Sequence, residues 1–178
     1  MKKVFQGDIF SVWQWDQELY DGSTKVFEKV QRTDAAFIIG VLPDKRILLI
    51  WDEQPDREGA LGPAGGKVEE GENPIDAAAR EFLEETGYKA TTIEPWISFA
   101  PYGKMIFTIH CFIGKGAEKV SEPSLEAGER ITPRFFTFDE FIALGQEETL
   151  RSTHLRIILL EAQLDSKKKD ILYQQLYG

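Results

Sequence analysis

The sequence predicts a mixed α/β fold with a small β-rich extension at its N-terminus. Two observations predict this class. The first third of the 178 residues is rich in the β-branched and aromatic side chains that strands favour. A single strong helical pattern begins after Asn73, and further helical patterns follow only towards the C-terminus. Strands and helices therefore alternate within one chain of ordinary domain size.

The N-terminal extension, residues 1–33, is expected to consist of strands. Val4–Trp15 and Lys25–Arg32 are rich in strand-forming residues, and Asp21-Gly22-Ser23 between them is a turn signal. Such an extension has too little mass to bury both of its faces alone. We therefore expect it to be a dimerisation wing that packs on a second copy of the chain, and we assign residues 34–178 to the main domain.

The main domain opens with a predicted hairpin. Two apolar runs, Ala35–Val41 and Arg46–Trp51, flank the turn-like Pro43-Asp44-Lys45, which predicts a pair of strands at the heart of a sheet. The stretch that follows, Asp52–Gly71, is rich in glycine, proline and acidic residues. This composition predicts a loop.

A helix is expected to begin at Asn73-Pro74. Asparagine is a good N-cap, proline suits the first helical position, and Gly87 supplies the stop. The apolar or small side chains that recur at helical spacing are Ile75, Ala78, Ala79, Phe82 and Thr86. These residues predict one face that packs on the sheet.

The remaining elements are weaker in pattern. We expect strands at Thr92–Phe99 and Met105–Ile113, then a long polar loop over Gly114–Thr132 and a closing strand at Phe135–Phe138. Two helices should follow, near Asp139–Leu144 and Thr153–Leu164. Lys167-Lys168-Lys169 is expected to interrupt the chain before a short amphipathic tail. A loop as long as Gly114–Thr132 is usually functional or disordered.

Composition excludes several classes of function. The chain has 21 basic and 30 acidic residues and a net charge of −9, which argues against nucleic-acid and membrane-surface partners because both reward clustered Lys and Arg. One cysteine, Cys111, allows no internal disulfide. Neither a signal peptide nor a membrane-spanning run is evident. We expect a cytoplasmic protein, in which metal ions would supply the positive charge needed to bind phosphates.

A cluster of carboxylates carries the chemistry. Glu81, Glu84 and Glu85 stand at i, i+3 and i+4, so they share one face of the predicted helix. Like charges at this spacing destabilise a helix, whereas a hard divalent cation needs several such oxygen ligands on a rigid element. Glu72 is placed to pair with Arg80 and to hold the preceding loop against the helix. Acidic helix faces are often merely solvated, but the joint spacing from Gly66 to Gly87 favours a metal site.

This joint spacing resembles the motif of a known family. The segment GKVEEGENPIDAAAREFLEETGY, residues 66–88, is similar to the Nudix box, with every fixed position filled. Phe82 and Tyr88 stand where aliphatic residues are more usual. The resemblance implies a mixed-sheet α/β/α sandwich and a hydrolase that uses Mg²⁺, or alternatively Mn²⁺. It also implies that Glu81 and Glu85 are the principal metal ligands.

The same likeness implies roles for neighbouring groups. Glu84 would be a further ligand or a carboxylate that orients water, the carbonyl of Gly65 would complete the coordination, and Gly66 with Arg80 would belong to the same site. Gly7-Asp8-Ile9-Phe10, Ala35-Ala36 and Gly128-Glu129-Arg130 are similar to the ADP-ribose pyrophosphatase branch. In that branch the N-terminal wing exchanges between two subunits and helps to bind adenosine. This implies a homodimer. It also implies a catalytic base in the late loop, Glu129 as first choice and Glu126 as second.

Some positions depart from that branch. Relatives carry an Arg-Gln-x-Arg stretch after the second core strand, whereas this chain reads Trp51–Arg57, so Arg57 is the candidate to grip a phosphate. Phe27 stands where relatives often have arginine. Trp13, Trp15, Tyr20 and Phe27 are candidates to stack on a base from the wing, and packing at a dimer interface or in a core is the competing interpretation. A structural role is favoured for His110, His154 and Cys111.

The expected function is hydrolysis of a nucleoside diphosphate linked to a second group, with ADP-ribose as the leading substrate. Two alternatives remain open. One is a sugar-nucleotide or housecleaning (d)NTP pyrophosphatase. The other is a non-catalytic Nudix domain that binds ADP-ribose as a regulatory ligand, although such domains usually lose a glutamate of the box and this chain loses none.

Overall fold

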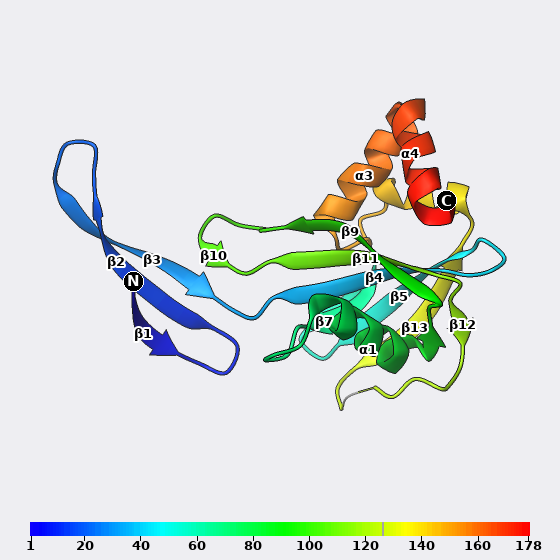
Figure 1. The fold of residues 1–178 in the computed structure, drawn as a ribbon, viewed down its shortest axis with the longest axis horizontal. Helices are drawn as coiled ribbons and strands as arrows, with labels where there is room; N and C mark the ends of the chain where they lie inside the picture. The colour runs from blue at the N-terminus through cyan, green and yellow to red at the C-terminus, as the bar shows by residue number, and fades with distance from the viewer. Residues whose placement is uncertain (126) are drawn as a thin grey trace.

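The computed structural model describes residues 1–125 and 127–178, which form a body around a seven-stranded sheet and a wing that projects from it (Figure 1). The wing is a four-stranded sheet in the order β1-β2-β3-β10. Its strands are β1 (Lys2–Gln6), β2 (Ser11–Glu18), β3 (Thr24–Gln31) and β10 (Met105–Ile106). The β2–β3 hairpin turns through residues 19–23, where the side chain of Asp21 accepts a hydrogen bond from the backbone N–H of Ser23 at 2.9 Å. The predicted turn is confirmed.

The strand expected over Met105–Ile113 divides into two. Met105 and Ile106 form β10, which pairs in parallel with β3 of the wing, whereas β11 (Ile109–Lys115) pairs with strands of the body. The expectation of one continuous strand is therefore wrong. The sequence pattern alone could not reveal the division, because both pieces are apolar and only their partners differ.

The seven-stranded sheet has the order β13-β5-β4-β11-β9, with β6 and β7 attached to β5 and β4. Its main strands are β4 (Ala35–Val41), β5 (Ile47–Gln54), β9 (Thr92–Phe99), β11 and β13 (Arg130–Phe136). β4 and β11 are parallel, and β4 pairs with β5 as the predicted antiparallel hairpin. β4 and the first half of β5 are buried on both faces, which accounts for their continuous apolar sequences.

The loop predicted over Asp52–Gly71 is wrong for most of its length. β5 runs on to Gln54, β6 (Arg57–Gly62) pairs with β5, and β7 (Ala64–Lys67) pairs with β4. Three of the glycines that suggested a loop, Gly59, Gly65 and Gly66, serve close packing instead. A Cβ on Gly65 would lie 2.1 Å from the carbonyl oxygen of Ala36, so only glycine allows β7 to lie against β4.

Helices cover the two faces of the body sheet, as the predicted α/β/α sandwich requires (Figure 1). α1 (Pro74–Thr86) packs one face through Ala77, Ala78 and Phe82. The other face is covered by α2 (Phe138–Ala143), α3 (Thr153–Leu164) and α4 (Ser166–Tyr177), with the short 3-10 helix η1 (Leu144–Gln146) between α2 and α3. Two apolar clusters, one on each face, form the core.

Three expectations for the C-terminal half need correction. The closing strand expected at Phe135–Phe138 is β13, which runs from Arg130 to Phe136, and Phe138 is the first residue of α2. Lys167–Lys169 do not interrupt a helix but lie inside α4, which begins because Asp165 accepts a hydrogen bond from the backbone N–H of Lys167 at 2.8 Å. The region expected as a polar loop contains β12 (Glu118–Lys119), which pairs with β8 (Tyr88–Lys89). No helix in the described part of the chain combines the length and the apolar character that crossing a membrane requires.

Candidate active site

α1 places the carboxylates, and its ends follow the sequence. Asn73 is the N-cap and Pro74 the first helical residue, but the Asn73 side chain donates to Asp76 at 3.1 Å and does not cap the backbone. Gly87 ends the helix in the left-handed conformation, with φ 74°, where its N–H reaches the carbonyl of Leu83. The predicted start and stop are confirmed. One flank of the helix thereby faces β7.

Arg80 connects the carboxylates to the preceding loop. Its guanidinium donates to both carboxylate oxygens of Glu72, at 3.0 and 3.1 Å, which confirms the predicted pair. It also donates to Glu81 at 2.9 Å, to Glu84 at 3.1 Å and to the carbonyl of Lys67 at 3.3 Å. These bonds raise the pKa of Arg80 far above its ordinary value. Arg80 is therefore a permanent cation that holds three glutamates and the loop in register.

Glu85 is the most deeply placed carboxylate, with 7% of the residue exposed. Its Oε2 accepts a hydrogen bond from the backbone N–H of Gly65 at 2.7 Å. Burial raises the pKa of Glu85 to about 8, and the negative charges of Glu81, Glu129 and Asp52 contribute to the same shift. Burial likewise raises the pKa of Glu81, against the opposing effect of Arg80. The site thus gathers acidic groups in a place where water screens charge poorly, so their ionisation is costly unless a cation compensates it.

Glycine brings these carboxylates against the backbone of β7. A Cβ on Gly66 would lie 2.6 Å from Oε1 of Glu81, so any side chain at Gly66 would displace that carboxylate. Gly65 has a φ of 144° and meets Glu85 through its N–H. The sequence predicted that the carbonyl of Gly65 would be a ligand, whereas the contact observed here is made by its amide.

The donor set fits a hard divalent cation in its chemistry. Within residues 1–125 and 127–178, no three acidic, His or Cys side chains are already gathered closely enough to form a ready-made metal site. Glu81 and Glu84 each accept a hydrogen bond from Arg80 at one carboxylate oxygen, and Glu85 accepts one from the backbone N–H of Gly65. The remaining carboxylate oxygens are the ligands that Mg²⁺ and Mn²⁺ prefer, and a buried carboxylate beside other negative charges is stabilised by a cation.

A cavity of about 220 Å³ opens beside Glu85 and Gly65. Its walls are mainly apolar and come from β4, β6, β9 and β11, including Phe37, Phe99 and Ile109. The polar side is formed by Asp52, Arg151 and Ser152. No sequence pattern singled out these three residues, because they come from β5 and from the segment before α3 and meet only in the folded chain.

Arg57 and Glu129 lie beside a second hollow, formed by the β5–β6 turn and the segment Gly128–Arg130. Arg57 forms a salt bridge with Asp52 at 2.7 Å. The negative charge of Glu129 raises the pKa values of both Glu81 and Glu85, so this loop residue lies close to the predicted metal ligands. Glu126, the second candidate for the base, lies outside the described residues.

The aromatic residues of the wing lie apart from this site within one chain. Trp13, Trp15 and Phe27 belong to β2 and β3, the long strands of the wing (Figure 1). The rings of Trp15 and Phe27 are 6.0 Å apart. Lys104 lies 5.0 Å from the Phe27 ring. No residue of the wing lines the cavity beside Glu85. A substrate contact by Trp13 or Phe27 therefore requires a second copy of the chain, and it stays a prediction.

Three further residues have structural partners. His110 is 3.2 Å from both Asp34 and Ser98, which links three segments at the junction of wing and body. His154 is exposed near the start of α3 and stacks on Phe99 with ring centroids 3.6 Å apart, in agreement with the structural role favoured for it. Cys111 lines the cavity, and burial raises its pKa to about 11, so the thiol is not activated.

Comparison with known proteins agrees with the fold and the box. The chain is 28% identical to the methanol dehydrogenase activator of Bacillus methanolicus, over 94% of this chain and 92% of that protein. It is 28% identical to the ADP-ribose pyrophosphatase of Bacillus subtilis, over 55% and 54% of the two chains. A crystal structure of an ADP compounds hydrolase superposes with a TM-score of 0.74 and 18% identity, covering 93% and 92% of the two chains, and shows a shared fold.

The family match rests on the same part of the chain that forms the body. Residues 31–159 match the NUDIX domain, and they include the whole segment from Gly66 to Tyr88, with Glu81 and Glu85 against β7. The chain belongs to the NUDIX domain family.

Proposed function

We propose that the chain is a divalent-metal-dependent pyrophosphohydrolase that cleaves a nucleoside diphosphate linked to a second group. ADP-ribose is the leading substrate, and its hydrolysis adds one water across the P–O–P bond to give AMP and ribose 5-phosphate. The similarity to an ADP-ribose pyrophosphatase over half of the chain supports this choice. The function is expected to be carried out by a homodimer.

One observation carries the proposal. Glu85 is buried beside Glu81 and Glu129, and its pKa is raised to about 8. Carboxylates crowded in this way are costly to the fold, and they occur where a site needs concentrated negative charge. In a family defined by this box, a bound cation is the partner that such an arrangement favours.

Each residue then has a defined task. When bound, Mg²⁺ or Mn²⁺ would neutralise the diphosphate and acidify the attacking water. Glu81 and Glu85, with Glu84, would hold the cation against β7. Arg80 keeps these carboxylates oriented through the bonds already described. Glu129, which is not in the box, would accept the proton of the attacking water.

A second candidate function has a specific observation in its favour. The similarity to a methanol dehydrogenase activator extends over 94% of this chain, more than for the ADP-ribose pyrophosphatase. The chain could therefore act as a regulatory protein that binds a nucleotide or a partner enzyme. Within catalysis, sugar nucleotides and (d)NTPs are alternative substrates of the same site.

A substrate panel tests these alternatives. ADP-ribose, other ADP compounds, sugar nucleotides and dNTPs are incubated with Mg²⁺, with Mn²⁺ or with excess chelator, and released AMP and phosphate are quantified. We expect turnover of ADP-ribose with either metal and none with chelator, because the carboxylates cannot stabilise an anionic diphosphate unaided. Full turnover in chelator contradicts the metal mechanism, and no turnover of any compound favours the regulatory function.

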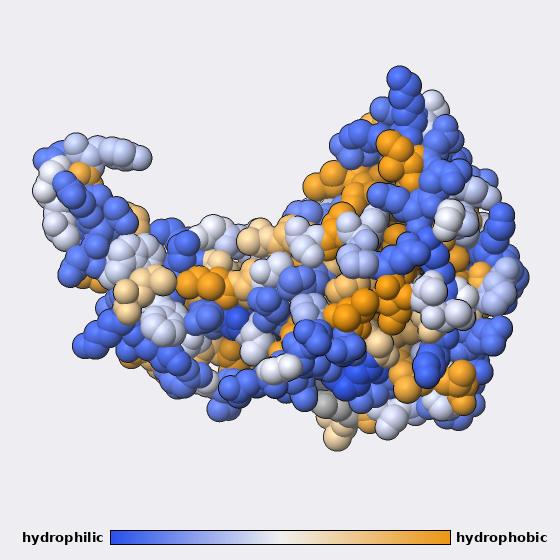
Figure 2. Space-filling model, viewed as in Figure 1, coloured by the Kyte–Doolittle hydropathy of each residue, from blue (hydrophilic) through white to orange (hydrophobic). Residues whose placement is uncertain are grey.

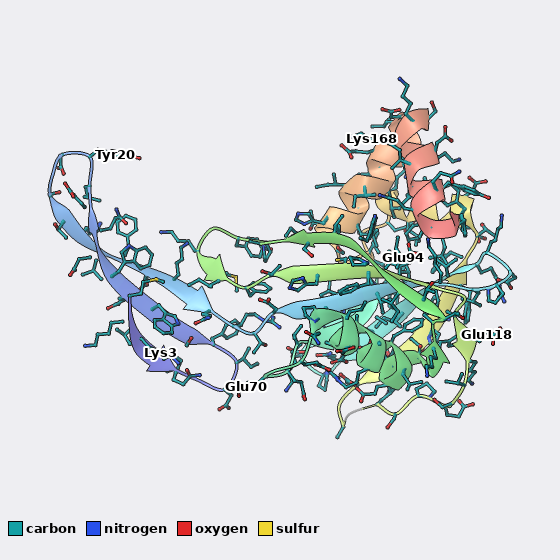
Figure 3. All side chains as sticks on the ribbon, in the orientation of Figure 1. Lys3, Tyr20, Glu70, Glu94, Glu118 and Lys168 are labelled. Carbon is teal, nitrogen blue, oxygen red and sulfur yellow. The ribbon has the colours of Figure 1, made fainter. Side chains whose placement is uncertain are left out.

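Glu85→Gln tests the box directly. The change removes one charge with little change of shape, and we expect kcat to fall by about a hundredfold or more. Glu70→Gln, an exposed glutamate in the same segment, is the matched control and should retain the rate (Figure 3). Steady-state kinetics of purified variants measure both. A near-normal rate for Glu85→Gln shows that the metal does not bind at the box.

A further inference from the structure

One buried carboxylate outside the box holds two arginines. Asp52, on β5, is 7% exposed. Its Oδ2 accepts from Arg57 at 2.7 Å and from Arg151 at 3.0 Å, and Arg151 also approaches the Asp52 carbonyl at 3.5 Å. The other oxygen, Oδ1, is buried and has no hydrogen-bond partner among the described residues. Both arginines therefore depend on a single carboxylate oxygen.

Stability does not account for this arrangement. A buried ion pair gains little over an apolar replacement, because both charges lose their hydration. A carboxylate oxygen left without a partner adds a further cost. The guanidinium groups remain reachable, with about two fifths of each arginine side chain exposed. Asp52 thus holds two accessible cations at a place where the fold alone would favour an apolar side chain.

Each of the two arginines lines a different hollow of the site. Arg151 lines the cavity that contains Glu85, together with Asp52. Arg57 lines the neighbouring hollow that contains Glu129. Asp52 connects the two. A substrate that extends from one hollow to the other would pass both guanidinium groups while it lies beside Glu85.

The charge of this cluster complements the rest of the site. Asp52 with two arginines carries a net charge of +1, whereas the neighbouring carboxylates are negative. Arg151 directly precedes the N-terminus of α3, whose dipole adds positive potential at the same point. Guanidinium groups match phosphate oxygens in geometry and charge. An anionic group is therefore the ligand that this wall of the site favours.

We propose that Arg151 joins Arg57, already the candidate to grip a phosphate, in a two-arginine clamp for the diphosphate of the substrate, and that Asp52 is the positioning residue that holds both. Arg151 is a substrate-binding residue outside the box. The inference rests on the proposed function only in taking a nucleoside diphosphate as the ligand, and it concerns binding, so it can be tested without turnover.

Calorimetric titration with two probes tests the clamp. ADP-ribose carries the diphosphate with its rings, and inorganic pyrophosphate carries the diphosphate alone. Arg151→Gln should weaken the binding of both probes by about tenfold or more, the size expected for a charge-assisted hydrogen bond to phosphate. Arg46→Gln is the matched control, because Arg46 forms an equally short pair with Asp44, at 2.7 Å, in the turn between β4 and β5. It should change neither affinity by more than about twofold.

A double-mutant comparison tests the role of Asp52. Asp52→Asn should weaken the binding of both probes. It should not weaken that binding further in a protein that already carries Arg57→Gln and Arg151→Gln. KM should rise more than kcat falls in any variant that turns over substrate. Asp44→Asn is the control, and thermal unfolding confirms that each variant is folded. If Asp52→Asn does not fold, the affinities of the Arg57→Gln and Arg151→Gln variants for the two probes decide whether the clamp exists.

The outcomes separate the clamp from the proposed function. Unchanged affinity for both probes in Arg151→Gln overturns the clamp. Weaker binding of ADP-ribose with unchanged binding of pyrophosphate also overturns it, because Arg151 would then contact a ring. Fully additive losses from Asp52→Asn and the arginine variants overturn the positioning role. If the wild-type chain binds both probes but hydrolyses nothing, the clamp stands and the proposed catalysis fails.

Discussion

At the scale of single residues, Glu85 links protonation to stability. Its pKa is about 8 in the folded chain, against an ordinary value of 4.5. Between these two pH values the folded state binds more protons than the unfolded state, so the free energy of unfolding falls as pH rises. The stability that protonated Glu85 contributes to the folded state is fully present below about pH 4.5, and it is lost as the pH rises to about 8. Stability falls with rising pH because burial beside other carboxylates makes the ionised form of Glu85 unfavourable in the folded chain.

This pH dependence gives a prediction for the metal-free protein. In chelator, Tm should fall between about pH 5 and 8, and the fall should be smaller in Glu85→Gln, whose amide does not ionise. Mg²⁺ added at pH 8 should raise Tm, because a ligand that binds the folded state stabilises it. Differential scanning calorimetry measures all three. An equally steep fall of Tm in Glu85→Gln would assign the pH dependence to other groups.

Glu129 gives the second prediction at this scale. Its charge acts on Glu81 and Glu85, as expected for a loop carboxylate beside the ligands. Glu129→Gln should lower kcat by about 10²–10⁴-fold, the usual contribution of a positioned base. Metal affinity should be nearly unchanged. The measurement pairs initial rates with Mn²⁺ titration.

Glu126→Gln is the comparison for this experiment. A large loss in Glu126→Gln with a normal rate in Glu129→Gln would place the base three residues earlier. Normal rates in both variants would move the base into the box, where Glu84 is the remaining carboxylate, because one of its oxygens bonds Arg80 and its side chain is 46% exposed.

At the scale of elements, the packing of α1 on the sheet fixes the position of the box. Phe82 is 1% exposed and lies against Gly40 of β4, where a Cβ would be 2.6 Å from the ring. Glycine on the strand therefore makes room for the aromatic side chain on the helix. This pair sets how closely the helix, and with it Glu81 and Glu85, approaches β7.

Phe82→Ala should be strongly destabilising. Removal of a fully buried aromatic side chain costs about 3–5 kcal/mol, because a cavity is left where the helix meets the sheet. Leu83→Ala, on the same helix but 36% exposed, is the control and should cost far less. Urea unfolding followed by circular dichroism measures both. Equal losses in the two variants would show that α1 is not anchored through Phe82.

The elements also show what the sequence could predict. α1 was found with both ends because its signals are local: Pro74 at the start and Gly87 at the stop. β4 and β9 were found to the residue because runs of apolar or β-branched residues mark them. β6 and β7 were missed because their glycines look like a loop until β4 and β5 are known to lie beside them.

The candidate site divides in the same way. Glu81, Glu84 and Glu85 lie within five residues of one another, so their spacing can be recognised in the sequence. The Asp52–Arg151 pair joins residues 99 positions apart, and no local pattern signals such a contact. The base remained ambiguous for a related reason, since a carboxylate in a loop has no periodicity that fixes its direction.

At the scale of the whole molecule, the wing is the least covered part of the chain. Its exposed apolar side chains include Phe5, Ile9 and Val26, each more than half exposed, and apolar surface is visible on both the wing and the body (Figure 2). A thin sheet cannot bury both of its faces by itself. This exposure supports the expectation of a homodimer formed through the wing.

Light scattering tests the dimer. We expect a mass of about 41 kDa, twice the 20.3 kDa of one chain, at micromolar concentration. Val26→Lys, at 57% exposure on β3, should shift the mass towards the monomer. Val120→Lys, at 59% exposure on the body, is the control and should leave the dimer intact. A mass near 20 kDa for the wild-type chain at all concentrations contradicts the dimer.

The division of the expected strand into β10 and β11 has a mechanical consequence. The chain passes between wing and body three times: at Arg32–Thr33, between β9 and β10, and at Phe107–Thr108. Asp34 accepts a hydrogen bond from the N–H of Thr108 at 2.7 Å, which joins the first and the last of these crossings. A wing attached at several points cannot swivel about one linker. A protease cut in one crossing would leave the wing attached through the others. Two bodies joined through their wings would therefore be held at a fixed spacing.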